Sequence, residues 1–381
     1  TGRGLAPAGR GRGGVVIMAA LAFSVQMPGM LTTVQDSGRW SYQGKGMPVA
    51  GAMDMQSFAL GNILVGNDEN AAALEVTLLG PTLSVTEGEG VAAVTGAELG
   101  FTVNGEPIAN WTVVTIREGD ILSFDGPRSG CRAYLCVSGG IDVPMVMESR
   151  STYTRAKVGG LEGRALKKGD AVRCGEPAPL WNRCEGLVCP EALRPLRDPA
   201  APLRVIPGPQ DDLFTEKGLA SFYGAEYVIS NSADRMGYRM DGEPIEHTGA
   251  ADIISDAIPL GAVQVPGHGQ PIVMLADRQT TGGYTKIGVV CSVDVAALSQ
   301  LLPGAKVRFS KIAVKDSVGL VRAEARTRDE LRKLRAAWRS SARVSSAPVP
   351  EAVAAPTGGE AVLRVDGKEH VISWEEIGEV E

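Results

Sequence analysis

The sequence predicts a mainly β protein built from two related β-rich halves, with a few short helices. Beta-branched residues are plentiful and long helical periodicities are few, while 48 glycines and 23 prolines indicate frequent turns. A chain of 381 residues is too long for one ordinary core and suits two domains with tails. An internal repeat supports the same organisation.

The repeat is clearest in a pentapeptide that occurs once in each half. The sequence NGEPI at 104–108 returns as DGEPI at 241–245, and both copies begin with a pair typical of a tight hairpin turn. Two further segments match in the same order, 116–121 with 258–263 and 133–140 with 273–283. Because three elements keep their order, we infer two halves with the same fold.

Composition and patterning then divide the chain along its length. The Gly- and Arg-rich start, residues 1–22, has no core-forming pattern and is expected to be a disordered tail. We expect a first β domain at 23–175, a Pro-rich linker at 176–202, a second β domain at 203–318, a basic helix at 319–338, a flexible linker at 339–359 and a C-terminal β-hairpin segment at 360–381.

Few helices are predicted, and each has a recognisable signal at one of its ends. Asp54 is expected to cap a helix that ends at Gly66, and Asp294 is expected to cap another. Residues 211–223 form a third short candidate, and the basic helix contains a capping box that starts at Thr327.

Charge and cysteine usage exclude several classes of function. A net charge of −6 argues against general nucleic-acid binding, and no apolar run is long enough to span a membrane. The six cysteines form no CxxC pair and there are three histidines, so no metal site is expected. With no signal peptide in the sequence, we expect reduced thiols and a cytoplasmic protein.

The most informative segment is the polar run 276–284, which lies between the apolar stretches 271–275 and 287–290. Buried polar groups need partners, and its glycines let the backbone approach a ligand closely. The first half of the repeat has only a short, nearly neutral link at this place, so the shared fold does not require the run. We interpret it as one wall of a binding pocket; the alternative is a corner whose polar groups satisfy one another.

Two other polar clusters, around residues 35–39 and 232–256, add further candidate site residues. The candidate catalytic residues are Asp277, Arg278, Asp234 and His247, because arginine offers a planar fork for carboxylate oxygens and histidine beside carboxylates can act as acid or base. As alternatives, Asp234-Arg235 and Asp277-Arg278 could be ion pairs that stiffen loops, and His247 could be a core histidine. The candidate substrate-binding residues are Gln279, Thr280, Thr281, Gly283, Tyr284, Arg235, Tyr238, Asp256, Gln35 and Arg39.

Several long motifs resemble one known family. They are VQDSGR at 34–39, GMPVAGAMD at 46–54, ALEVT at 73–77 and SRSTY at 149–153, with further matches at 139–144, 208–212, 232–239, 253–256 and 276–286. In this order they resemble the KipA family, also described as the C-type subunits of 5-oxoprolinase or the second allophanate-hydrolase-type subunit. The family is similar to biotin-dependent carboxyltransferases, and the resemblance covers residues 23–310.

The resemblance implies a fold, partners and a reaction. It implies two cyclophilin-like β-barrel domains, a KipI-type partner (the B-type subunit of 5-oxoprolinase) and a further LamB/YcsF-type partner (the A-type subunit). The implied reaction is the ATP-dependent opening of 5-oxoproline, a small cyclic amide, to glutamate. No P-loop is recognisable, so ATP would be used by the complex through partner residues or through an unrecognised site.

Two other functions stay open at this point. The chain could be a carboxyltransferase subunit that moves a carboxyl group from carboxybiotin to an amide or urea-like substrate. No biotin-attachment motif occurs, so the biotin would come on a separate carrier and no cofactor is expected to be bound covalently. Alternatively, the chain could be a binding module that sequesters a KipI-type kinase inhibitor. Neither nucleic acid nor membrane is expected as a partner.

Overall fold

A computed structural model describes residues 20–179, 181–338, 358–365 and 368–375. The chain forms two compact units, residues 1–340 and 341–381, of which the first contains both β-rich halves. Most of the predicted N-terminal tail and of the flexible linker lies outside the described residues. In the second unit, β21 (Gly358–Val365) and β22 (Lys368–Glu375) pair antiparallel, as predicted for the C-terminal hairpin.

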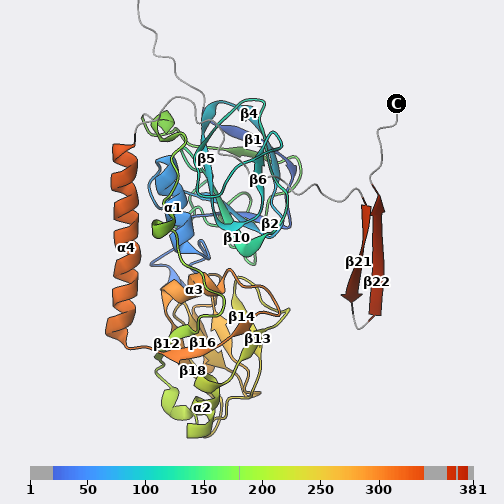
Figure 1. Ribbon diagram of the computed structural model, residues 1–381. Coiled ribbons are helices and arrows are strands. Elements are labelled where there is room, and N and C mark those ends of the chain that lie inside the picture. The colour runs from blue at the N-terminus through green and yellow to red at the C-terminus, as the bar shows by residue number, and fades with distance from the viewer. Residues whose placement is uncertain (1–19, 180, 339–357, 366–367, 376–381) are drawn as a thin grey trace, which may run out of the picture. The chain divides into compact units, whose positions relative to one another are not determined.

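The first half consists of two sheets that enclose a common core (Figure 1). One sheet has the order β11-β1-β4-β9-β6-β7, the other β2-β3-β10-β5-β8. Phe23, Leu74 and Leu135 are among the buried side chains between them. The strands are β1 Ala22–Met27, β2 Leu31–Gln35, β3 Ala73–Thr77, β4 Thr82–Glu87, β5 Glu89–Glu98, β6 Phe101–Val103, β7 Glu106–Pro107, β8 Val114–Arg117, β9 Ile121–Phe124, β10 Ser129–Val137 and β11 Ala171–Arg173.

The second half is one nearly closed barrel sheet with its own core. Its strand order is β19-β13-β14-β17-β16-β18-β12-β20, and β15 pairs with β18 outside this path. The strands are β12 Leu203–Pro207, β13 Tyr227–Ile229, β14 Gly237–Asp241, β15 Asp252–Ala257, β16 Ala262–Val265, β17 Ile272–Met274, β18 Thr281–Val290, β19 Lys306–Val307 and β20 Phe309–Lys311. The predicted fold class, mainly β with two barrel domains and a few helices, is confirmed.

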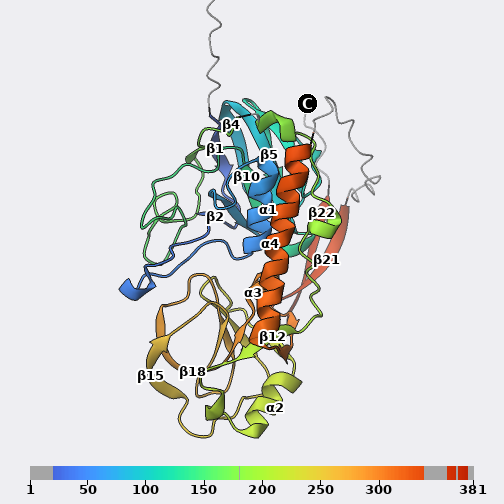
Figure 2. The ribbon, with the colours of Figure 1, turned by 90° about the vertical axis from the view of Figure 1, so that its left-hand side faces the viewer.

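The helices lie beside the barrels and between them. They are α1 Met55–Val65, α2 Glu216–Gly224, α3 Ser292–Leu298 and α4 Val314–Ala337, with short 3-10 turns η1 Gln43–Lys45, η2 Trp181–Cys184, η3 Glu191–Leu193 and η4 Asp211–Leu213. Figures 1 and 2 show α4 running along α1 on one side of the molecule. Within the described residues, no helix has the length and apolar character needed to cross a membrane.

The ends of α1 form as predicted. The Asp54 carboxylate accepts a hydrogen bond from the Ser57 backbone N–H at 3.1 Å. Gly66 ends the helix in the left-handed conformation, with φ at 88°. Residues 56–65 are all buried, because α4 covers one side of the helix and β5 and β10 lie on the other.

Two predicted helix signals are wrong. The basic helix begins at Val314 rather than at 319, and Thr327 lies inside it, where its hydroxyl donates to the Ala323 carbonyl at 3.2 Å. The cap of α3 is Cys291, while Asp294 lies in the first turn and pairs with Arg204. In both cases the side chain that was expected to cap the helix is hydrogen-bonded or ion-paired to another residue instead.

The repeated pentapeptide folds differently in the two halves. Asn104 and Gly105 both have positive φ, at 55° and 80°, and form the predicted tight turn between β6 and β7. The predicted turn at 241–242 is wrong. There β14 pairs with β13 and β17 instead, and the Gly242 N–H donates to the Gln270 side chain at 2.8 Å.

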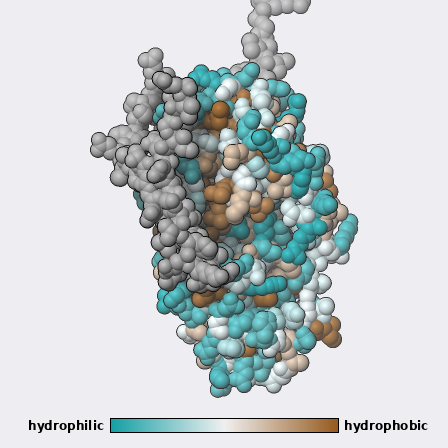
Figure 3. Space-filling model, turned by 90° about the vertical axis from the view of Figure 1, so that its right-hand side faces the viewer, coloured by the Kyte–Doolittle hydropathy of each residue, from teal (hydrophilic) through white to brown (hydrophobic). Residues whose placement is uncertain are grey.

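The predicted inter-domain linker packs on the first half. It contains η2 and η3, and Cys184, Leu187 and Cys189 belong to a buried cluster around α1 and Tyr134. Where the face in Figure 3 is not grey, hydrophilic residues are widespread and hydrophobic residues form patches among them.

Leu331 anchors α4 to the first half, and its replacement by alanine should lower the stability of the protein. It is fully buried in the cluster around α1, whereas the rest of α4 is mostly exposed. We expect Leu331→Ala to lower the free energy of unfolding by about 2–5 kcal/mol in denaturant titrations, because it leaves a cavity. Val321→Ala, on the exposed side of the same helix, should change it by less than about 0.5 kcal/mol. Equal effects of the two variants would contradict this role.

Candidate functional site

A buried ion-pair cluster joins the polar run 276–284 to the first barrel. The Arg235 guanidinium donates to both carboxylate oxygens of Asp277, at 3.0 and 3.1 Å, and to Glu75 Oε1. Its Nη2 also donates to the Gly51 carbonyl at 2.7 Å. The three charged side chains are at most 8% exposed. Since Glu75 belongs to β3 and Arg235 to the second barrel, the cluster fixes the two barrels to each other.

Glu75 is held firmly by its own barrel. Its Oε2 accepts hydrogen bonds from the Tyr134 hydroxyl at 2.9 Å and from the Met53 N–H at 2.8 Å. Burial raises the pKa of Tyr134 well above its ordinary value, so its hydroxyl stays a donor. In the sequence, Glu75 stood out only as part of a motif. A carboxylate inside an otherwise apolar strand was the signal that could have identified it.

Asp277 lies at the junction of the two barrels with its backbone also fixed. Its N–H donates to the Arg235 carbonyl at 2.9 Å, and the preceding carbonyl, of Ala276, accepts from the Ala50 N–H at 3.1 Å. Burial raises the pKa of the Asp277 carboxyl, and the paired guanidinium opposes that rise. Asp277 is therefore the counter-charge of Arg235 and not, as the alternative interpretation expected, of Arg278.

Arg278 is a buried cation without a carboxylate partner in the described part of the chain. Its Nε donates to the Ile258 carbonyl at 2.9 Å and its Nη1 to the Leu275 carbonyl at 3.1 Å. The residue is 6% exposed, and burial lowers the pKa of its guanidinium to about 10. A buried charge is stable only when it is paired. Arg278 is thus prepared for an anionic group from outside the chain.

Such a group can enter a small pocket that Arg278 lines. The pocket has a volume of about 120 Å³ and lies where the loop before α1, the start of α1, the start of the polar run, α3 and α4 meet. Glu324 of α4 also lines it, and burial raises the pKa of that carboxyl. Trp40, Val49 and Met53 give it apolar walls. Because drug-sized sites take about 300–1,000 Å³, this pocket suits only a small molecule or one end of a larger one.

A second group of polar side chains lies around Gly282 of β18, and we call Gln264 of β16, Gln279 before β18, and Gly282 and Lys286 of β18 the Gly282 cluster. The strand register places Gln264 opposite Lys286, and Asp256 of β15 opposite Gly282. Directly opposed residues point to the same side of a sheet. Lys286 Nζ lies 3.0 Å from Asp256 Oδ2. Two buried amide atoms of the cluster, Gln264 Nε2 and Gln279 Oε1, have no hydrogen-bond partner among the described residues.

The predicted catalytic residue Asp234 lies at the surface. Its carboxylate accepts from the N–H groups of Met236 and Gly237, at 2.8 and 3.1 Å, and pairs with Arg155 at 3.0 Å. The side chain is 52% exposed. The structure therefore places Asp234 as a turn-forming residue and as a surface link to the first barrel, with Arg155 rather than Arg235 as its partner.

The structure gives His247 no carboxylate contact within the described residues. Its Nε2 is hydrogen-bonded to the Val265 carbonyl at 3.1 Å and to the Thr285 hydroxyl at 3.0 Å. Its ring packs on Phe214 with centroids 4.6 Å apart. This is the environment of a satisfied core histidine, the alternative that the sequence left open.

The remaining predicted substrate-binding residues are spread over both barrels. The Tyr238 hydroxyl accepts from Arg132 at 2.7 Å in the inter-barrel contact. Gln35 and Arg39 are fully buried in the first barrel, where Arg39 Nε donates to the Val146 carbonyl at 3.2 Å. Thr280 precedes β18 and Thr281, Gly283 and Tyr284 form its first part, where all four are partly exposed or exposed, and Asp256 is half-exposed on β15.

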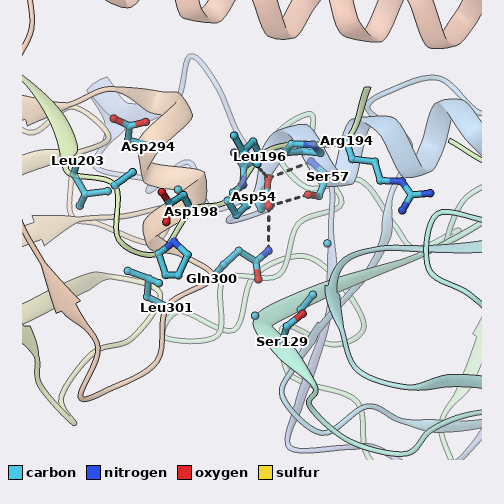
Figure 4. A pocket seen from close by; sticks show the side chains of 18 of the residues that line it. Asp54, Ser57, Ser129, Arg194, Leu196, Asp198, Leu203, Asp294, Gln300 and Leu301 are labelled. Carbon is cyan, nitrogen blue, oxygen red and sulfur yellow. Dashed lines mark hydrogen bonds and ion pairs between the residues drawn. The ribbon is translucent and has the colours of Figure 1, made fainter. Parts of the chain in front are cut away.

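A larger cavity of about 780 Å³ lies under residues 191–204, between the barrels (Figure 4). Two of its acidic side chains, Asp54 and Asp294, are ion-paired with arginines. Asp54 pairs with Arg197 at 2.8 Å and accepts from Gln300 at 3.0 Å, and Asp294 pairs with Arg204. Size alone would favour this cavity, but the smaller pocket contains a buried cation, Arg278, without a carboxylate partner among the described residues. We therefore take the Arg278 pocket as the candidate site.

Arg235 should be essential for stability, and its loss should make stability depend on pH. We expect Arg235→Met to lower the free energy of unfolding by about 3–5 kcal/mol, because it leaves two buried carboxylates unpaired. Without the guanidinium the folded-state pKa of Asp277 rises further above its unfolded value. The variant's stability should thus be greater at pH 5 than at pH 8, falling as pH rises through that range.

Denaturant titrations at the two pH values check this expectation. Arg155→Met is the matched control, since it removes a half-exposed ion pair and should cost about 0–1 kcal/mol. An Arg235→Met protein whose loss of stability is small or independent of pH would contradict the role assigned to the cluster.

Comparisons with known proteins agree with this architecture. The family model for the carboxyltransferase domain, subdomain A and B, matches residues 45–311. The 5-oxoprolinase C-type subunit of Haemophilus influenzae is 36% identical over 302 residues, which cover 79% of this chain and 95% of that protein. The protein of the same name from Escherichia coli is 37% identical over 292 residues, covering 76% and 91%.

Solved structures show the same fold within much longer chains. The crystal structure of the K. lactis urea amidolyase matches with a TM-score of 0.77 and 32% identity, over 82% of this chain. The match spans only 20% of the amidolyase chain. The chain belongs to the carboxyltransferase-domain family, subdomain A and B, and is similar to the 5-oxoprolinase C-type subunits along nearly their whole length.

Proposed function

We propose that this chain is the C-type subunit of a 5-oxoprolinase, an enzyme complex that opens 5-oxoproline to glutamate with ATP. The observation that carries the proposal is the buried Arg278 guanidinium, which lines a small pocket and lacks a counter-charge among the described residues. 5-oxoproline is a small anion that combines a carboxylate with a cyclic amide. The similarity to the C-type subunits over at least 91% of their length supports the same function.

The chemistry of the pocket fits this substrate. A guanidinium with a pKa of about 10 remains charged at neutral pH, so it can pair with the substrate carboxylate. The apolar wall formed by Trp40 and Val49 would face the ring carbons. Binding in a site from which water is excluded strengthens the ion pair and fixes the orientation of the substrate.

Partner subunits would supply the rest of the reaction. We propose a KipI-type protein and a LamB/YcsF-type protein as the partners, with ATP used by the assembled complex. In this arrangement the present chain binds and orients the substrate, while phosphate activation of the amide takes place against partner residues. The role of Asp277 is then to hold Arg235 and the start of the polar run in place.

A carboxyltransferase is the second candidate function. The family model and the urea amidolyase structure favour it. In that case a carboxyl group would pass from carboxybiotin, carried by a separate protein, to an amide or urea-like acceptor. The Arg278 pocket would then bind the carboxyl group in transfer.

The proposal predicts that Arg278→Ala impairs the complex without unfolding it. The chain is co-purified with its two partner subunits, and glutamate release from 5-oxoproline is followed with and without ATP. Loss of a charge-assisted contact should lower kcat/KM by about 10- to 100-fold. Arg278→Lys keeps the charge but loses the planar fork and should recover only part of the activity.

Arg117→Ala on β8, which removes an exposed arginine, is the matched control and should leave turnover unchanged. Full turnover in Arg278→Ala would show that the pocket is not the substrate site. Carboxylation from carboxybiotin without ATP-dependent glutamate release, in the wild-type complex, would select the second function instead.

A further inference from the structure

The Gly282 cluster presents an unpaired donor, an unpaired acceptor and an ammonium group with one described contact in one small region. Gln264 Nε2 and Gln279 Oε1 are buried without hydrogen-bond partners. Lys286 Nζ has three N–H donors and a single described contact, to Asp256. A Cβ atom at Gly282 would lie 3.0 Å from Gln264 Nε2 and 3.5 Å from Gln279 Nε2. The two amide groups therefore meet at this glycine.

Unpaired buried polar atoms destabilise a folded protein, so a group of them at one place indicates a function such as ligand binding. Two donors beside one acceptor are complementary to a ligand that offers a carbonyl oxygen and an N–H on the same side. A cis secondary amide has this arrangement, as in a lactam or a cyclic urea. An ordinary trans peptide bond places the two groups on opposite sides and does not fit.

We propose that the Gly282 cluster recognises the cis amide of a ring-shaped ligand. Gln264 and Lys286 donate to its carbonyl oxygen, and Gln279 accepts from its N–H. The identification of this ligand with 5-oxoproline rests on the proposed function. The amide recognition itself would equally serve a cyclic urea such as the ureido ring of biotin.

The cluster lies next to the Arg278 pocket, which allows one ligand to use both. Ile258 separates them: its carbonyl accepts from Arg278 Nε at 2.9 Å, and its Cδ1 lies 2.6 Å from the position of a Cβ at Gly282. Its N–H donates to the Thr280 carbonyl at 3.0 Å. A carboxylate on Arg278 and an amide at Gly282 would therefore be the two ends of one small molecule.

Access to the cluster requires β15 to move, and the structure shows that this strand is weakly held. β15 is exposed along most of its length and pairs only with β18, with an irregular register between Asp252 and Asp256. Few buried contacts and exposed hydrogen bonds are the properties of segments that open locally. Opening separates Asp256 from Lys286 and frees all three ammonium donors for the ligand.

Ligand-observed NMR on the full chain, co-purified with its partner subunits, tests the proposal. The probes are 2-pyrrolidinone, 2-imidazolidinone and N-methyl-2-pyrrolidinone, which lacks the N–H. We expect the first two to bind and the methylated lactam to bind at least about tenfold more weakly, since it leaves Gln279 unpaired. A preference between the first two separates a lactam ligand from a cyclic urea.

Two variants locate the binding. Gly282→Ala adds a methyl group 2.6 Å from Ile258 Cδ1 and 3.0 Å from Gln264 Nε2, so the Ile258 side chain must shift and lactam binding should be abolished. Gly267→Ala, whose Cβ would meet nothing closer than 3.8 Å, is the control for a glycine-to-alanine change. Gln264→Leu should weaken binding and at the same time raise Tm, because it removes an unpaired buried amide. A purely structural glutamine would lower Tm instead.

The outcomes separate this inference from the proposed function. Equal binding of the methylated lactam, or unchanged binding in Gly282→Ala, would overturn the amide site even if the complex releases glutamate; the two glutamines would then pair with each other. Conversely, lactam binding that Gly282→Ala abolishes, in a complex without ATP-dependent glutamate release, would support the amide site while overturning the 5-oxoprolinase assignment.

Discussion

The rest of the structure depends on the Arg235 guanidinium, which neutralises one buried carboxylate from each barrel. Its contact with Glu75 crosses the boundary between two separate hydrophobic cores, and its contact with Asp277 holds it within the second barrel. A buried charge that loses its partner costs far more than a broken surface pair, so the two barrels are constrained to one arrangement. The start of the polar run is fixed at the same place, because the Ala50 N–H also donates to the Ala276 carbonyl.

This constraint creates the candidate site. The Arg278 pocket takes part of its wall from the first barrel, through Trp40 and Val49, and its cation from the second. Neither barrel alone would contain it. The polar run thus has two features that lower the stability of the fold: an unpaired cation at Arg278 and unpaired amide atoms around Gly282. Sites that bind polar ligands commonly retain such groups at the expense of stability.

The sequence located the functional region better than it assigned partners within it. The polar run was identified because one half of the repeat contains it and the other does not. Within the run, however, Asp277 pairs with Arg235 and not with its neighbour Arg278, and Asp234 pairs with Arg155. Glu75 and Lys286 stood out only inside motifs. The apolar neighbours of Glu75 could have indicated its burial, but no local feature identifies the partner that a buried charge meets.

By itself the sequence determined the mainly β class, the two related halves, the Asp54 cap of α1 and the turn at 104–105. These features depend on residues a few positions apart, so local propensity is sufficient to define them. Only the tertiary structure decided which buried charges pair and which remain free. Glu75 and Arg235 are separated by 160 residues, and pairing over that distance follows from how the two barrels pack, which no short window of sequence contains. The same packing decided that the expected turn at 241–242 does not form.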